Sequence, residues 1–144
     1  MLLKLIIFLH IICATIWTGG HLILSFGFLP KALSKNDFSI IEQFESRFER
    51  IGIPALLILV ITGIYMAIIY TTDFFEFDIS NHQNKHIYIK LLLLLSTVLL
   101  AVHARFFLIP KKKLKPLAYH IGLVTLIAVL FVFVGFSLRS GGLL

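Results

Sequence analysis

Histidines are the side chains of this chain with the clearest capacity for chemistry. Four of the six fall within long apolar runs: His10, His21, His103 and His120. A neutral imidazole offers a lone pair to iron, copper or zinc. Because an ionisable side chain inside an apolar run is costly to bury, these histidines are the first candidates for a cofactor or metal site.

His10 and His21 lie on one face of their apolar run. They are 11 residues apart, and at about 100° per residue this spacing returns a helix to nearly the same direction. Trp17 shares that face and is a candidate for the same site. The position 11 residues before His103 is Leu92, so His10 has no histidine partner at its own level.

His21 and His103 are predicted to lie at one depth. At about 1.5 Å per residue, His21 stands roughly 12 Å from Leu29 and His103 roughly 9 Å from Ile109, at the same end of their helices. If the first and third helices face each other diagonally, these imidazoles can hold a flat haem b between them. Two axial imidazoles give a six-coordinate iron suited to electron transfer.

Other polar side chains near that level could complete a haem site. Arg47, Arg50 and Arg105 are placed to meet the propionates with charge-assisted hydrogen bonds. His120, early in the fourth helix, is a further candidate for cofactor binding. Whether His10 or His21 pairs with His103 is left open by the sequence; the depth argument favours His21.

Copper is the main alternative to haem. A copper transporter or sensor would draw its ligands from a set with one methionine: His10, Met66, His82 and His86. The segment before the third helix adds three carboxylates, Asp73, Glu76 and Asp78, and a carboxylate–imidazole set there suits Cu(II) or Zn(II).

Four apolar helices must position these residues. Of the 144 residues, 59% are hydrophobic and 14% charged, and the mean hydropathy is +1.00. We predict a single all-α domain, residues 1–144, an integral membrane four-helix bundle with up-down-up-down topology. The expected spans are residues 2–29, 51–70, 87–109 and 117–138, each long enough to cross a hydrocarbon core of about 30 Å. Pro30 and Pro110 mark two of the ends.

An amphipathic segment, residues 40–49, predicts a short interfacial helix that runs into the second span. Charge placement predicts the orientation, since 13 residues are Lys or Arg. Nine lie in or beside the two connections 30–50 and 105–115, which the positive-inside rule assigns to the cytoplasm. Both termini are then outside a bacterial-type inner membrane. The short lysine run between spans does not indicate nucleic-acid binding.

Two runs of residues resemble known membrane families. His10, Ala14, Trp17 and Gly19-Gly20 are spaced as in the first helix of the copper-resistance CopD family. A second set is similar to the related HemJ-type protoporphyrinogen oxidases, four-helix proteins associated with haem b: Glu45 to Ile51, Pro54-Ala55, Gly63, Lys90 and His103. This resemblance implies roles for His10, Arg47, Lys90 and His103.

The leading hypothesis is a haem b membrane protein of the CopD/HemJ group, an electron carrier or oxidoreductase with His21 and His103 as axial ligands. Its expected partners are the lipid bilayer, haem or a porphyrin, and an electron donor or acceptor. A homo-oligomer is compatible with the sequence. The alternatives are a copper transporter or sensor, and an enzyme that oxidises protoporphyrinogen.

Overall fold

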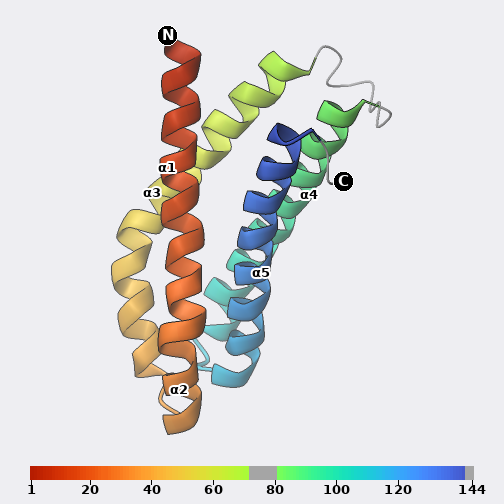
Figure 1. Cartoon of the computed structure of the whole chain (residues 1–144). Helices are drawn as coiled ribbons and strands as arrows, with labels where there is room; N and C mark the ends of the chain where they lie inside the picture. Colours follow the sequence, from red (N-terminus) through yellow and green to blue (C-terminus); the bar gives the residue numbers. More distant parts are fainter. Residues whose placement is uncertain (72–80, 142–144) are drawn as a thin grey trace.

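Four long apolar helices run back and forth beside one another in the computed structural model of the chain (Figure 1), which describes residues 1–71 and 81–141. The first is α1 (Leu2–Ile23), continued by a π-helical turn, η1 (Leu24–Phe28), and by α2 (Leu29–Lys35). The second is α3 (Ser39–Tyr70). The third is α4 (His82–His103), continued by a second π-helical turn, η2 (Ala104–Leu108), and the fourth is α5 (Leu114–Arg139).

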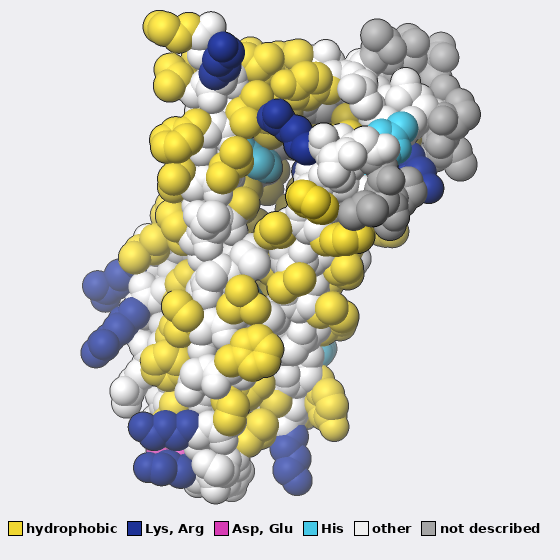
Figure 2. Space-filling view, viewed as in Figure 1, with side chains coloured by type: hydrophobic (Ala, Val, Ile, Leu, Met, Phe, Trp, Pro, Cys, Tyr) yellow, Lys and Arg dark blue, Asp and Glu magenta, His cyan; other side chains and the backbone are white. Residues whose placement is uncertain are grey.

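Each of these four helices is long and apolar enough to cross a membrane. A helix is suited to lipid because it satisfies its backbone hydrogen bonds within one segment. Large apolar side chains point outward, as with Phe26 at 77% exposure and Phe106 at 68%, and they cover the visible surface of the bundle (Figure 2). The predicted all-α membrane bundle is therefore confirmed.

The helices contact one another in the order α3, α1, α5, α4, so α1 and α4 are not direct neighbours. α1 packs against α3 and α5, and α4 packs against α5, whereas α3 and α4 have no comparable contact within the described residues. The N-terminus and the end of α5 lie at the same end of the bundle (Figure 1). We call this the terminal end, and we call the other, where residues 36–38 and 109–113 connect the helices, the connecting end.

The prediction that the first helix ends before Pro30 is wrong, because the chain stays helical to Lys35. The π-helical turn η1 is the reason: the Leu29 N–H bonds the Leu24 carbonyl, five residues back. Pro30 then falls in the first turn of α2, where a missing N–H costs least. The helix ends instead at Asn36, whose φ of 49° is left-handed.

The starts of α3 and α4 also differ from the residues predicted for them. The predicted interfacial segment is the first part of α3, which continues without a break into the second span. Before it, Asp37 accepts hydrogen bonds from the hydroxyl and the N–H of Ser39, and these hold the pKa of Asp37 below its usual value. α4 begins at His82 instead of residue 87, since the Asn81 side chain caps it by accepting from Gln83 N–H.

α1 and α3 pack closely around one aromatic ring. The Phe48 ring lies against Gly20 of α1 and Gly52 of α3, and a Cβ on either glycine would collide with it. Phe48 is also held by ring contacts with Trp17, His21 and Phe44. Because the ring is enclosed on these sides, it has little room to move away.

Gly20→Ala is therefore expected to destabilise the bundle by about 1–3 kcal/mol, the usual cost of overpacking a closed contact. Gly19→Ala is the matched control, since a Cβ there meets nothing within 4 Å, and the substitution favours the helix. Thermal unfolding of the two variants in detergent, followed by circular dichroism, measures the difference. Equal unfolding midpoints for Gly20→Ala and the unmodified chain would contradict this packing.

Candidate metal-binding site

His103 and His120 form a direct pair at the connecting end. His103 Nδ1 lies 2.8 Å from His120 Nε2, and the rings stack with centroids 4.9 Å apart. His103 is five residues from the end of η2 and His120 six from the start of α5, so both stand roughly 8–9 Å from their helix ends. His103 is exposed on the bundle surface and His120 is partly buried. The structure thus unites two predicted cofactor residues from neighbouring helices.

Hydrogen bonds fix the proton positions in this histidine pair. The carbonyl oxygen of Pro116 lies 3.1 Å from His120 Nδ1 and can only accept, so His120 carries its proton on Nδ1. Its Nε2 then accepts from His103 Nδ1–H. The remaining nitrogen, His103 Nε2, keeps its lone pair and has no partner among the described residues. The free Nε2 can take up the proton when Nδ1 of the same ring binds a metal ion.

His21 occupies a different environment, between α1 and α3. Its Nδ1 donates to the carbonyl oxygen of Trp17 at 2.8 Å, and its ring packs on Trp17 and edge-on against Phe48. No contact joins it to His103 in the described part of the chain. The reason is rotational: His103 turns toward α5, and His21 turns toward α3. The bis-histidine haem stays a prediction, without a pair of imidazoles brought face to face.

His10 contacts α3 near the terminal end. The Thr62 hydroxyl donates to the Ile58 carbonyl at 2.6 Å, so its oxygen accepts the proton of His10 Nδ1 at 2.7 Å. His10 Cε1 packs 3.5 Å from the place of a Cβ on Gly63. The structure therefore joins His10 to α3, while Trp17 packs on His21 and Lys90 packs against Gly135 of α5.

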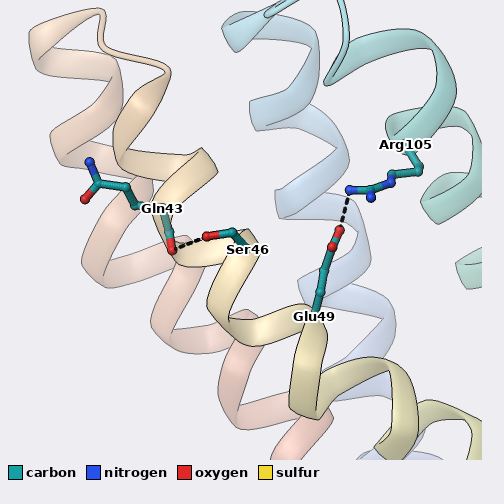
Figure 3. A network of polar contacts seen from close by, with 4 residues as sticks. All are labelled: Gln43, Ser46, Glu49 and Arg105. Atoms are coloured by element: carbon teal, nitrogen blue, oxygen red, sulfur yellow. Dashed lines mark hydrogen bonds and ion pairs between the residues drawn. The ribbon is translucent and has the colours of Figure 1, made fainter.

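The three arginines predicted to contact haem propionates have other surroundings in the structure. Arg105 Nη1 lies 2.6 Å from Glu49 Oε1 (Figure 3), and Arg47 and Arg50 are exposed. Arg105 also lines a cavity of about 250 Å³ between α3, η2 and α5, together with three glutamates, Glu42, Glu45 and Glu49. The helical spacing of the amphipathic segment places these glutamates on its polar face, but they were not among the predicted site residues.

The copper ligands predicted at the terminal end are not gathered into one site. His86 is fully buried, with Nδ1 on the His82 carbonyl and Nε2 2.9 Å from Ser137 Oγ. Asp73, Glu76 and Asp78 lie outside the described residues. Within the described ranges, no three His, Cys, Asp or Glu side chains are grouped to hold a metal. His86 lies in α4 and not in the predicted loop, because the helix already starts after its Asn81 cap.

Four apolar helices, each long enough to cross a membrane, define a multi-pass membrane protein. One family matches the sequence: Copper resistance protein D (CopD), over residues 42–138. The chain belongs to this CopD family. No curated protein and no protein of solved structure matches it. The matched region holds His103, His120 and Lys90 but leaves out His10 and His21.

The proton positions predict a distinct nuclear magnetic resonance signature. In ¹⁵N-histidine-labelled protein in alkaline buffer, His103 and His120 should both carry the proton on Nδ1. A scalar coupling across the hydrogen bond should join His103 Nδ1 to His120 Nε2. His120→Ala should remove this coupling, whereas His21→Ala should leave it. Protonation of His120 on Nε2 in the unmodified chain would contradict the assigned hydrogen-bond direction.

Proposed function

We propose that this CopD-family chain handles copper in the membrane, binding the ion as cargo between His103 and His120. The observation that carries the proposal is the 2.8 Å separation of the two imidazole nitrogens. Two nitrogens each about 2.0 Å from one metal ion, at a right angle, stand about 2.8 Å apart. A copper ion can therefore replace the shared proton after a modest rotation of the rings.

The proton released from this pair has a defined destination. When His103 binds copper through Nδ1, its proton moves to Nε2, which is the free nitrogen of the same ring. The imidazole changes tautomer and stays neutral, so metal binding adds only the charge of the ion itself. Imidazole is a common ligand of copper, and it is deprotonated at the binding nitrogen when it coordinates.

A site with two protein ligands suits an ion in transit. No third ligand stands beside the pair among the described residues, so the remaining positions are open to a donor or acceptor. The cavity lined by Glu42, Glu45 and Glu49 lies at the same end of the bundle and offers carboxylates to an approaching cation. By the positive-inside rule, the excess of Lys and Arg at the connecting end favours a cytoplasmic position for this end.

A haem-based redox role is the second candidate, favoured by one observation. His21 and His103 each hold a proton on Nδ1 and leave Nε2 without a partner among the described residues. The fit of a haem between them is poor, since they turn toward different helices. The two cavities described between the helices also have no histidine in their lining. We therefore derive no electron-transfer step from this pair.

Copper titration of the detergent-purified protein tests the proposal. Cu(I) is titrated without oxygen against a competing chelator, and Cu(II) is followed by electron paramagnetic resonance. We expect His103→Ala and His120→Ala each to weaken binding by at least about tenfold, as loss of a ligand does. His21→Ala is the matched control, since it removes an imidazole that lies outside the pair.

The same purified proteins distinguish the copper proposal from its alternatives. Unchanged copper affinity in both His103→Ala and His120→Ala would remove the proposed site. Reducible b-type absorption bands in protein from haem-replete cells, lost in His21→Ala and His103→Ala, would instead establish the haem role. Thermal unfolding of each variant shows whether a loss of binding arises from a loss of fold.

A further inference from the structure

Three glutamates of α3 face one cavity at the connecting end. Glu42, Glu45 and Glu49 line a space of about 250 Å³ between α3, η2 and the start of α5. Glu45 and Glu49 are four residues apart, so they are neighbours on one helix face, with Cβ atoms about 5–6 Å apart. Glu42 is exposed, whereas Glu45 and Glu49 are partly buried. Two groups of like charge are thus held side by side with limited access to water.

One guanidinium group shares this cavity with the glutamates. Arg105 of η2 belongs to the lining, and its Nη1 lies 2.6 Å from Glu49 Oε1 (Figure 3). Ile109 and Leu117 close other parts of the cavity with apolar side chains. The bond of Arg105 to Glu49 joins η2 to α3, and Glu45 stands one helical turn before this ion pair.

Among the described residues, the neighbouring elements add no other charged side chain to the lining of this cavity. His21 of α1 packs on Trp17 and edge-on against Phe48. The basic side chains of α2 and of the stretch around the start of α5 are exposed: Lys31, Lys35, Lys111, Lys112, Lys113 and Lys115. The protonation of Glu45 is therefore governed by the cavity, by Glu49 and by Arg105.

Two carboxylates that share a partly buried site do not both ionise readily, because each negative charge raises the cost of the other. Burial raises the pKa of Glu45 to about 7, the charge of Glu49 adds to this rise, and the charge of Arg105 opposes it. Glu45 belongs to the amphipathic first part of α3, which precedes the apolar span. The geometry therefore places a carboxyl group that titrates near neutral pH beside an ion pair between two helices.

We propose that Glu45 is a proton-binding site, which exchanges one proton with the solvent at the connecting end through this cavity, and that Glu49 and Arg105 set its affinity. When protonated, the Glu45 hydroxyl can donate a hydrogen bond to a carboxylate oxygen of Glu49. When the proton leaves to solvent, the guanidinium group of Arg105 gains a second carboxylate acceptor on α3. The proton concentration at the connecting end thus determines whether Arg105 pairs with one carboxylate or with two.

Titration of the detergent-purified protein measures this proton directly. The carboxyl carbons of the glutamates are labelled with ¹³C and followed by nuclear magnetic resonance from about pH 4 to about pH 9, a range that covers ordinary and raised carboxyl pKa values. The signal of Glu45 is the one that is missing in Glu45→Gln. We expect this signal to titrate with a pKa of about 7 in the unmodified chain.

Substitutions of the two neighbours should shift the Glu45 titration in opposite directions. Glu49→Gln removes a negative charge and should lower the midpoint by about one pH unit, and Arg105→Gln removes a positive charge and should raise it by about as much, each roughly a tenfold change in proton affinity. Arg105→Lys is the matched control, since it retains the charge and should leave the midpoint in place. Glu42→Gln should move the midpoint less than Glu49→Gln, because Glu42 is exposed and water screens its charge.

The free energy of unfolding gives a second readout of the same proton. Because the pKa of Glu45 is raised in the folded chain, the folded chain holds a proton that the unfolded chain releases, and its stability decreases as pH rises from about 4.5 to about 7. Glu45→Gln should remove this decrease. The unfolding temperature of Glu45→Gln, relative to that of the unmodified chain, should therefore be higher at about pH 8 than at about pH 4.

Two results would overturn the proposal. One is a Glu45 signal that titrates in the ordinary range of a glutamate in the unmodified chain. The other is a shift of this signal in the same direction in Glu49→Gln and Arg105→Gln, since opposite charges cannot act alike on one titration. Circular dichroism shows that each titrated variant is folded. Because no metal is added, the outcome is independent of copper binding by His103 and His120.

Discussion

Hydrocarbon offers no hydrogen bonds, so a polar group within the four helices is costly to leave without a partner in the protein. Four of the histidines satisfy one ring nitrogen, Nδ1, with a hydrogen bond. His21, His86 and His120 each use Nδ1 to bond the carbonyl four residues earlier in the same helix, and His10 uses Nδ1 to bond Thr62. The ring is then fixed with Nε2 pointing away from its own backbone. What each histidine can do is decided by what stands in front of Nε2: Ser137 for His86, and the ring of His103 for His120.

The sequence predicted the helices that carry these residues, but neither the relative depth of the histidines nor their direction followed from it. The depth of His21 was counted from Leu29, whereas the helix continues to Lys35. The His21 carbonyl contacts Thr125, five residues further along α5 than the His120 that pairs with His103. Direction requires the rotation of each helix about its axis. In a soluble protein the apolar stripe reports this rotation, but here lipid and core are equally apolar, and the stripe is lost. The facing of His103 toward His120 therefore depends on the packing of α4 against α5, which no periodicity in the sequence revealed.

The helix ends were also not predictable from the local sequence alone. Pro30 and Pro110 both come two residues after a π-helical turn, and in each case the residue before the proline bonds a carbonyl five residues back. After Pro30 the helix continues for another turn and more, whereas after Pro110 it stops. The local sequence is similar, and the difference lies in the residues beyond each proline. α2 buries Ala32 in the core cluster with Leu24 and Ile41, while the lysines after Pro110 have no apolar surface to pack on, and Lys112 adopts a φ of 49°.

The connecting end carries both signs of charge close together. Three glutamates line a cavity there with Arg105, which pairs with Glu49, and the exposed Arg47 and Arg50 lie on the same stretch of α3. This balance of charge does not select a cation. The proposed copper binding therefore depends on the two imidazole nitrogens that α4 and α5 bring together at His103 and His120.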